Sequence, residues 1–367
     1  MRRLFFILLL LVFCTVPVMS QTDSAIVELE ENTANTGKVD VKEVVFEHLK
    51  DSYEWHIITV GEKEYSISLP VILHSKSSGW HYFMSRELYE NGGSYDGFVI
   101  AEDGSYAGKL MELMPDGSLV KPFDLSLTKV ALGIIINCAL LLVIILCVGC
   151  WYRKHNYTDP APKGFVGMIE FVVAMLVDDV IKPAIGRDYR RYTPMLLTMF
   201  FFIILSNLMG LIPIFPAGAN VTGNIAVTLF LALVTFFTVN IFGNGEYWRD
   251  ILWPDVPVFL KAPLPILPVI EVFGIFTKPF ALTVRLFANM TAGHSIILAL
   301  TCVIFITGRM GPMIGTPMTV VSVLFMVFMN MLELLVAYVQ AYVFTILSAM
   351  FIGLSRPQGH ERKSETE

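Results

Sequence analysis

Cysteine is absent from the polar segment that precedes the first long internal apolar run. All five cysteines of the chain fall in apolar runs: Cys14, Cys138, Cys147, Cys150 and Cys302. The polar segment has four histidines, whose spacing matches no metal-ligand motif: His48, His56, His74 and His81. Neither a disulfide framework nor a zinc site is therefore indicated, and surface or packing roles are expected for these histidines.

Charge is also scarce. Only 16% of the 367 residues are charged, whereas 55% are hydrophobic, and the mean hydropathy is +0.64. Several apolar runs reach the roughly 20 residues that cross the hydrocarbon core of a bilayer. These features predict a polytopic membrane protein. The net charge of −6 says little by itself, because acids and bases are segregated by region and topology depends on that segregation.

The N-terminus has the form of a secretory signal peptide, residues 1–20. Arg2 and Arg3 precede an apolar stretch over residues 4–18, and the small residue Ser20 precedes the predicted cleavage site. The mature N-terminus is then outside the cytoplasm. An uncleaved signal anchor is the alternative.

Residues 21–127 are polar and mixed in sign. Segments such as Trp55-His-Ile-Ile-Thr-Val60 alternate in polarity, and turn signals follow at Asn91-Gly-Gly, Asp103-Gly and Asp116-Gly. Alternation with period two between turns predicts a small exported domain that is rich in β-strands.

Residues 128–355 form the predicted membrane domain, an all-α region with about five transmembrane helices. The first run ends at Trp151-Tyr-Arg-Lys-His155, and the positive-inside rule places this end in the cytoplasm. The resulting topology puts the N-terminus outside and the tail, residues 356–367, inside. The five predicted crossings are residues 130–151, 194–212, 225–242, 263–307 and 317–354.

Two features complete this fold class. Residues 164–185 mix apolar residues with acids and a lysine, which is typical of an interfacial amphipathic helix or of an ordinary amphipathic packing helix. Residues 243–261 are charged and are expected to be a cytoplasmic loop. Each of the last two runs is about twice the length needed to cross, and we favour one long, tilted helix for each over two spans joined by a tight turn.

Intramembrane polar residues gather on these two long helices. Glu271, Lys278 and Arg285 are seven residues apart and lie within about 40° of one another on a helix, with Asn289 one turn beyond. His294 is about 180° around from Arg285. On the last helix Glu333 and Gln340 share a face, with Asn330 a turn before Glu333. Antiparallel helices would bring His294 near Glu333 and Gln340 near Arg285.

Each of these groups also has a structural interpretation. Lys278 is placed to snorkel to the inner interface, with Glu271 as its ion-pair partner. Asn289 and Gln340 are suited to interhelical hydrogen bonds. A structural role fits Arg285 least, because no acid lies within a turn of it and an unpaired buried cation is strongly unfavourable. Its counter-charge must come from another helix or another protein.

Three motifs carry a family resemblance. They are Ser206-Asn-Leu-Met-Gly-Leu-Ile-Pro213, Lys278-Pro279 followed by Arg285-Leu-Phe-Ala-Asn-Met290 and Ala292-Gly-His294, and Leu332-Glu-Leu with Val339-Gln-Ala-Tyr-Val-Phe-Thr345. The chain closely resembles subunit a of the F-type ATP synthase over residues 130–354. The exported segment is much longer than the N-terminal segment typical of that family, so nothing carries over to it.

The resemblance implies a stator channel facing a rotating ring of small hairpin subunits in a bacterial inner membrane. Arg285 would face the ring carboxylates, with Asn289 and Gln340 at the same contact. Glu271 would lie on the cytoplasmic half-channel and His294 and Glu333 on the external one. The expected partners are the c ring, the peripheral-stalk b subunits, other ATP synthase subunits and the lipid bilayer, with no nucleic acid, cofactor or metal. Gly210 stands where many members have an acid.

Two other classes remain open. A secondary transporter would bind an anionic solute at Arg285, but such proteins usually show internal repeats, and none is visible. A purely structural scaffold would carry its activity in the exported domain, although five or six polar groups at matched depth argue against this. Whether the coupling ion is a proton or sodium depends on the ring subunit, not on this chain.

Overall fold

A computed structural model describes most of the chain. The described residues are 51–60, 63–101, 108–114, 116–155, 160–212, 218, 220–252, 266–309 and 311–356. The predicted signal peptide, residues 21–50 of the predicted exported domain and nearly all of the predicted tail lie outside them. The chain divides into two compact units. The first contains Met1–Asn137, Leu208–Val221 and Thr291–Leu334, and the second contains Cys138–Asn207, Thr222–Met290 and Leu335–Glu367.

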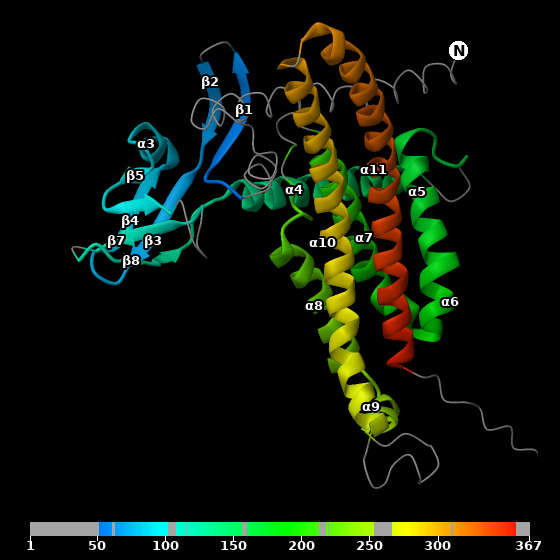
Figure 1. Ribbon diagram of the computed structural model, residues 1–367. Helices are drawn as coiled ribbons and strands as arrows, with labels where there is room; N and C mark the ends of the chain where they lie inside the picture. The colour runs from blue at the N-terminus through cyan, green and yellow to red at the C-terminus, as the bar shows by residue number, and fades with distance from the viewer. Residues whose placement is uncertain are drawn as a thin grey trace, which may run out of the picture. The chain divides into compact units, whose positions relative to one another are not determined.

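The N-terminal part of the first unit is rich in short antiparallel strands, as the alternating sequence predicts (Figure 1). β1 (Glu54–Val60) pairs with β2 (Lys63–Ser68). A three-stranded sheet has the order β4 (Gly79–Met84), β3 (Pro70–Ser75), β9 (Phe123–Asp124), and a four-stranded sheet has the order β5 (Ser94–Tyr95), β6 (Phe98–Ile100), β7 (Leu110–Leu113), β8 (Leu119–Val120). One short helix, α3 (Ser85–Glu90), follows β4.

A small apolar core holds this β-rich part together. Alternate residues of β3 are buried, as period-two alternation requires. The core residues are Tyr53, Val71, Leu73, Phe83, Leu88, Phe98 and Leu110. Glu112 of β7 is also buried, and its carboxylate accepts hydrogen bonds from the hydroxyls of Ser75 and Ser77. A buried carboxylate is tolerated here because these hydroxyls replace water.

The first unit also contains a helical hairpin. α10 (Ile266–Arg309) contributes its C-terminal part and α11 (Pro312–Leu354) its N-terminal part. Ile297 and Met326, both fully buried, pack together in this hairpin. Gly315 lets the two helices approach closely, since a Cβ atom there would lie 3.1 Å from the Cα of Gly308. α11 begins five residues earlier than expected, with Pro312 at a first helical position that suits proline.

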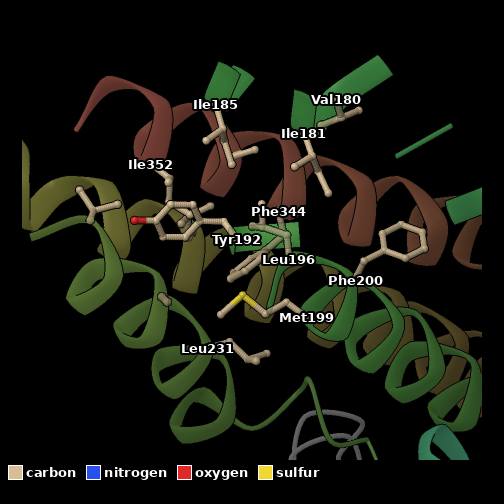
Figure 2. Packing of buried hydrophobic residues seen from close by; sticks show 14 of the residues in the cluster. Val180, Ile181, Ile185, Tyr192, Leu196, Met199, Phe200, Leu231, Phe344 and Ile352 are labelled. Atoms are coloured by element: carbon tan, nitrogen blue, oxygen red, sulfur yellow. The ribbon is translucent and has the colours of Figure 1, made fainter. Parts of the chain in front are cut away.

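The second unit is a helical bundle. It contains the remainder of α4 (Lys129–Lys154), α5 (Phe165–Met175), a π-helical turn (Leu176–Ile181), α6 (Lys182–Ile185), most of α7 (Tyr189–Leu211), α8 (Ile225–Ile241) and α9 (Gly245–Leu252), with the adjoining parts of α10 and α11. Figure 2 shows its core, where Ile181 and Ile185 lie near Tyr192 and Leu196 of α7 and Phe344 of α11.

Residues 165–185 form a packing helix with one buried face. Leu176, Val180 and Ile181 are buried, whereas Asp178 and Asp179 are exposed. The side chains of Met175 and Tyr338 are in contact, and a Cβ atom at Gly353 would lie 2.0 Å from the Ala184 carbonyl oxygen. The segment therefore runs along α11 in this unit. Its position at the membrane interface stays a prediction.

The loop expected over residues 243–261 contains a helix, so that prediction is wrong for its first half. α9 brings Tyr247 and Ile251, one turn apart, into the core of the second unit. Glu246 in its first turn suits the positive end of the helix dipole. The charged residues of this segment suggested a loop, so the apolar side of α9 was not recognised in the sequence.

The long apolar runs form membrane-length helices. Among the described residues, four candidate spans are found, Lys129–Lys154, Phe165–Leu211, Ile270–Arg309 and Gly315–Leu354, and α8 is a shorter apolar helix of 17 residues. The preference for single long helices in the last two runs is confirmed, because Pro279 lies inside a continuous α10. The count of five crossings and the tilts stay predictions.

Candidate functional site

His294 and Glu333 form a buried pair in the first unit. His294 Nδ1 lies 2.5 Å from Glu333 Oε1, and both side chains are less than a tenth exposed. The residues come from the two antiparallel arms of the helical hairpin, which aligns them across a separation of 39 residues in sequence. The expectation that these two groups meet is confirmed. A proton can pass between a carboxylate and an imidazole at this distance.

Glycine makes room for this pair on both sides. A Cβ atom at Gly293 would lie 2.9 Å from Glu333 Oε1. The carbonyl oxygen of Gly210 lies 3.2 Å from His294 Nε2 and can accept a hydrogen bond from it. A backbone carbonyl therefore supplies the acceptor at Gly210.

Several buried oxygen atoms near this pair lack hydrogen-bond partners among the described residues. They include Glu333 Oε2, the side-chain oxygen of Asn330 one turn before it, and Thr291 Oγ1 one turn before His294. A buried polar atom without a partner costs about 1–3 kcal/mol. The hairpin thus has several polar atoms close to the His294–Glu333 pair whose hydrogen-bonding capacity no described residue takes up.

Arg285 lies on an exposed face of α10 in the second unit. Large apolar side chains at helical spacing share this face, including Phe273 and Phe280, each 67% exposed, and Val284. No hydrogen bond or ion pair to Arg285 is found within the described part of the chain. The predicted contact with Gln340 is therefore not seen as a hydrogen bond. An unpaired guanidinium on an apolar face requires a partner from outside these residues.

Asn289 and Gln340 differ in exposure. Asn289 is exposed one turn from Arg285, and Gln340 of α11 is half-buried. Neither forms a side-chain hydrogen bond to another helix in the described residues, so the interpretation as interhelical glue gains no support.

Lys278 is half-buried, and its ammonium group lies 5.4 Å from the centre of the Phe351 ring. This is a cation–π contact. Lys278 and Phe351 line a small open pocket in the second unit together with Asn240 and Tyr247. Glu271 is exposed, and no ion pair between it and Lys278 occurs in the described residues. Burial raises the pKa of Tyr247, and the negative charge of Glu271 raises it further.

Two groups that form hydrogen bonds in and beside the candidate site were not recognised from the sequence. The Gly210 carbonyl has no side-chain signal, although its place in the Ser206–Pro213 motif marked the segment. Asn207 in the same motif donates a hydrogen bond to the Ala337 carbonyl, 3.2 Å away, and accepts one from Thr222, 2.7 Å away. An asparagine inside an apolar run was the available signal, since such residues commonly link membrane helices.

Comparison with known proteins gives consistent matches. The family model described as ATP synthase A chain matches residues 134–353, and one described as a domain of unknown function matches residues 44–125. ATP synthase subunit a of Chloroherpeton thalassium is 43% identical over 240 residues, covering 64% of this chain and 67% of the relative. The subunit a of Chlorobium phaeobacteroides is 40% identical (69% and 73% covered), and that of Anaeromyxobacter dehalogenans is 39% identical (70% and 67% covered). The chain therefore belongs to the family of subunit a of the F-type ATP synthase.

Proposed function

We propose that this chain, a membrane subunit of the ATP synthase rather than an enzyme by itself, is its stator channel. It conducts protons through two offset half-channels to and from the carboxylates of a ring of small hairpin subunits. Arg285 separates the half-channels and drives deprotonation of the ring carboxyl that faces it.

The observation that carries this proposal is Arg285 on an exposed apolar face of α10, where no described residue forms an ion pair with it. Such a face suits an apolar ring surface that presents one carboxyl group per subunit. A lipid-facing carboxyl must be protonated, because an ion in hydrocarbon is too costly. Beside the permanently positive guanidinium the carboxylate is favoured, so the proton leaves to one aqueous half-channel. The same cation repels protons and prevents direct leakage between the half-channels.

The buried His294–Glu333 pair serves as the proton relay of the external half-channel. Its short contact and the polar atoms of the same hairpin support this role. Glu271 serves the cytoplasmic half-channel, and Asn289 and Gln340 line the contact with the ring. Lys278 lies on the cytoplasmic side, where its charge can interact with Glu271 through water.

The family membership implies other ATP synthase subunits as partners and a multi-pass membrane location. The c ring and the peripheral-stalk b subunits are the proposed contacts. The inner membrane is the proposed location, with a signal peptide at residues 1–20, the N-terminus outside and the C-terminus in the cytoplasm.

The test replaces Arg285 with alanine in the assembled complex. We expect ATP synthesis and ATP-driven proton pumping to fall to background while the complex still assembles, because the ring carboxylate loses its only proposed cation. Arg309→Ala, which removes an arginine at the end of the same helix, is the matched control, and we expect it to retain pumping. Normal pumping by the Arg285→Ala complex would overturn the proposal.

A further inference from the structure

The three-stranded sheet of the first unit has a second apolar face, opposite its core. β3 pairs with β4 so that Ile72 lies beside Tyr82 and His74 beside Trp80, and with β9 so that His74 also lies beside Phe123. Side chains of directly paired residues lie on one face of a sheet. The Trp80 and His74 rings are in edge contact, with centroids 4.7 Å apart, as this register requires.

Beyond β9 the chain continues this face. The amide groups of Leu125 and Leu127 donate hydrogen bonds to the carbonyl oxygens of Ile72 and Pro70. Three rows therefore cross the sheet: Trp80, His74 and Phe123; Tyr82, Ile72 and Leu125; and Met84, Pro70 and Leu127. We name these nine residues the aromatic face.

The outer members of the aromatic face are open to solvent. Trp80 is 63% exposed, Tyr82 69% and Phe123 61%. Val71, Leu73 and Phe83 on the opposite face are buried and already form the core. The aromatic face is thus not needed to build the domain, and a contiguous apolar patch of this kind indicates an interaction surface.

The chain itself indicates what covers the aromatic face. After Leu127 only one residue, Thr128, precedes α4, a helix long enough to cross a membrane. The start of α4 is tied to the same domain, because the amides of Lys129 and Val130 donate hydrogen bonds to Ser52 O and Asp51 Oδ1. The sheet is therefore held at the point where the chain enters the bilayer. Tryptophan and tyrosine are the side chains that concentrate at the membrane–water interface.

We propose that the aromatic face binds the lipid leaflet on its own side of the membrane, as an interfacial anchor for the N-terminal domain. The proposal rests on the membrane location of the family and not on the channel mechanism. The sheet then lies on the headgroup region, with the rings of Trp80, Tyr82 and Phe123 in it.

The experiment uses the full chain in nanodiscs of phosphatidylcholine, with or without bromine atoms on the upper acyl chain. The emission of Trp80 is obtained as the difference between the unaltered chain and Trp80→Phe. We expect bromine to reduce this emission by about twofold or more, since an interfacial indole lies beside the upper acyl chain.

A matched pair of variants localises the contact. Phe123→Glu adds a charge to the row that contains Trp80, and we expect it to abolish the quenching. Leu119→Glu alters a leucine on β8 that is 50% exposed and lies outside the aromatic face, and it should leave the quenching unchanged.

Other occupants give different results. Equal Trp80 emission in both lipids would overturn the proposal. If the emission is equal in both lipids and Trp80 becomes accessible to aqueous iodide only after residues 21–43 are deleted, that segment covers the aromatic face. If Trp80 is protected from iodide only in the assembled complex, a partner subunit covers it, and the proposal is again wrong.

Discussion

At the scale of single residues, His294 and Glu333 depend on each other. Each is buried, and each is the principal partner of the other at 2.5 Å. Removal of one member leaves the other without its partner in an apolar environment, which is strongly unfavourable. The proposed relay therefore predicts non-additive effects when the two residues are replaced.

This dependence predicts the outcome of a double-mutant cycle. His294→Ala and Glu333→Ala should each slow passive proton flux through membranes stripped of the soluble part of the enzyme, and the double variant should be no slower than the worse single variant. The expected coupling energy is about 0.5–3 kcal/mol. Additive effects on flux, or unchanged flux in both single variants, would contradict the relay.

Glu112 makes the stability of the β-rich domain depend on pH. The hydroxyls of Ser75 and Ser77 donate hydrogen bonds to its carboxylate and hold its pKa below the ordinary value. Since the folded pKa is lowered, the carboxylate adds stability above the unfolded pKa of about 4.3, and this is lost as the pH falls through the lower folded pKa.

Thermal unfolding of the domain in the full chain, followed by tryptophan fluorescence, tests whether its stability falls at low pH. The midpoint should decrease below about pH 4 in the unaltered chain, and part of the decrease should be absent in Glu112→Gln. Asp116→Asn, at an exposed turn, is the control and should keep the full decrease. The same pH profile in Glu112→Gln and the unaltered chain would show that Glu112 does not contribute.

At the scale of elements, close approach of backbones holds α11 against α6. A Cβ atom at Gly353 would lie 2.0 Å from the Ala184 carbonyl oxygen, which is backbone and cannot move alone. Small residues at such crossings let membrane helices pack by van der Waals contact. Gly274 of α10 has no atom within 4 Å of its Cβ position and provides a comparison.

Gly353→Ala should therefore lower the thermal midpoint of the detergent-solubilised chain, with a cost of about 1–3 kcal/mol for overpacking. Gly274→Ala should leave the midpoint unchanged or raise it, because alanine is the better helix former. Equal shifts in the two variants would show that the α6–α11 contact does not limit stability.

At the scale of the whole molecule, the proposed role of Arg285 requires a partner protein, since no described residue pairs with it. A tagged chain purified in mild detergent should retain a ring of small hairpin subunits, and Arg285→Ala should retain it as well, because the apolar face remains. A stable solitary protein with saturable uptake of an anionic solute would instead favour a secondary transporter.

Much of the architecture followed from sequence pattern alone. Apolar runs of 45 and 38 residues predicted α10 and α11 as single helices, and alternation predicted the β-rich domain. Spacing by sevens placed Glu271, Lys278 and Arg285 on one side of a helix. The helix α9 was missed, because it is only eight residues long and lies in a segment whose charged residues suggested a loop.

The sequence by itself determined the family, the membrane class and the permanent charge of Arg285, because these depend on residue type and local spacing. Only the tertiary structure decided that His294 and Glu333 approach to 2.5 Å, that the Gly210 carbonyl completes their surroundings, and that Arg285 forms no hydrogen bond with Gln340 in the described chain. Such contacts join residues that are tens of positions apart in sequence. Their distances depend on how the helices pack, which local patterns do not encode.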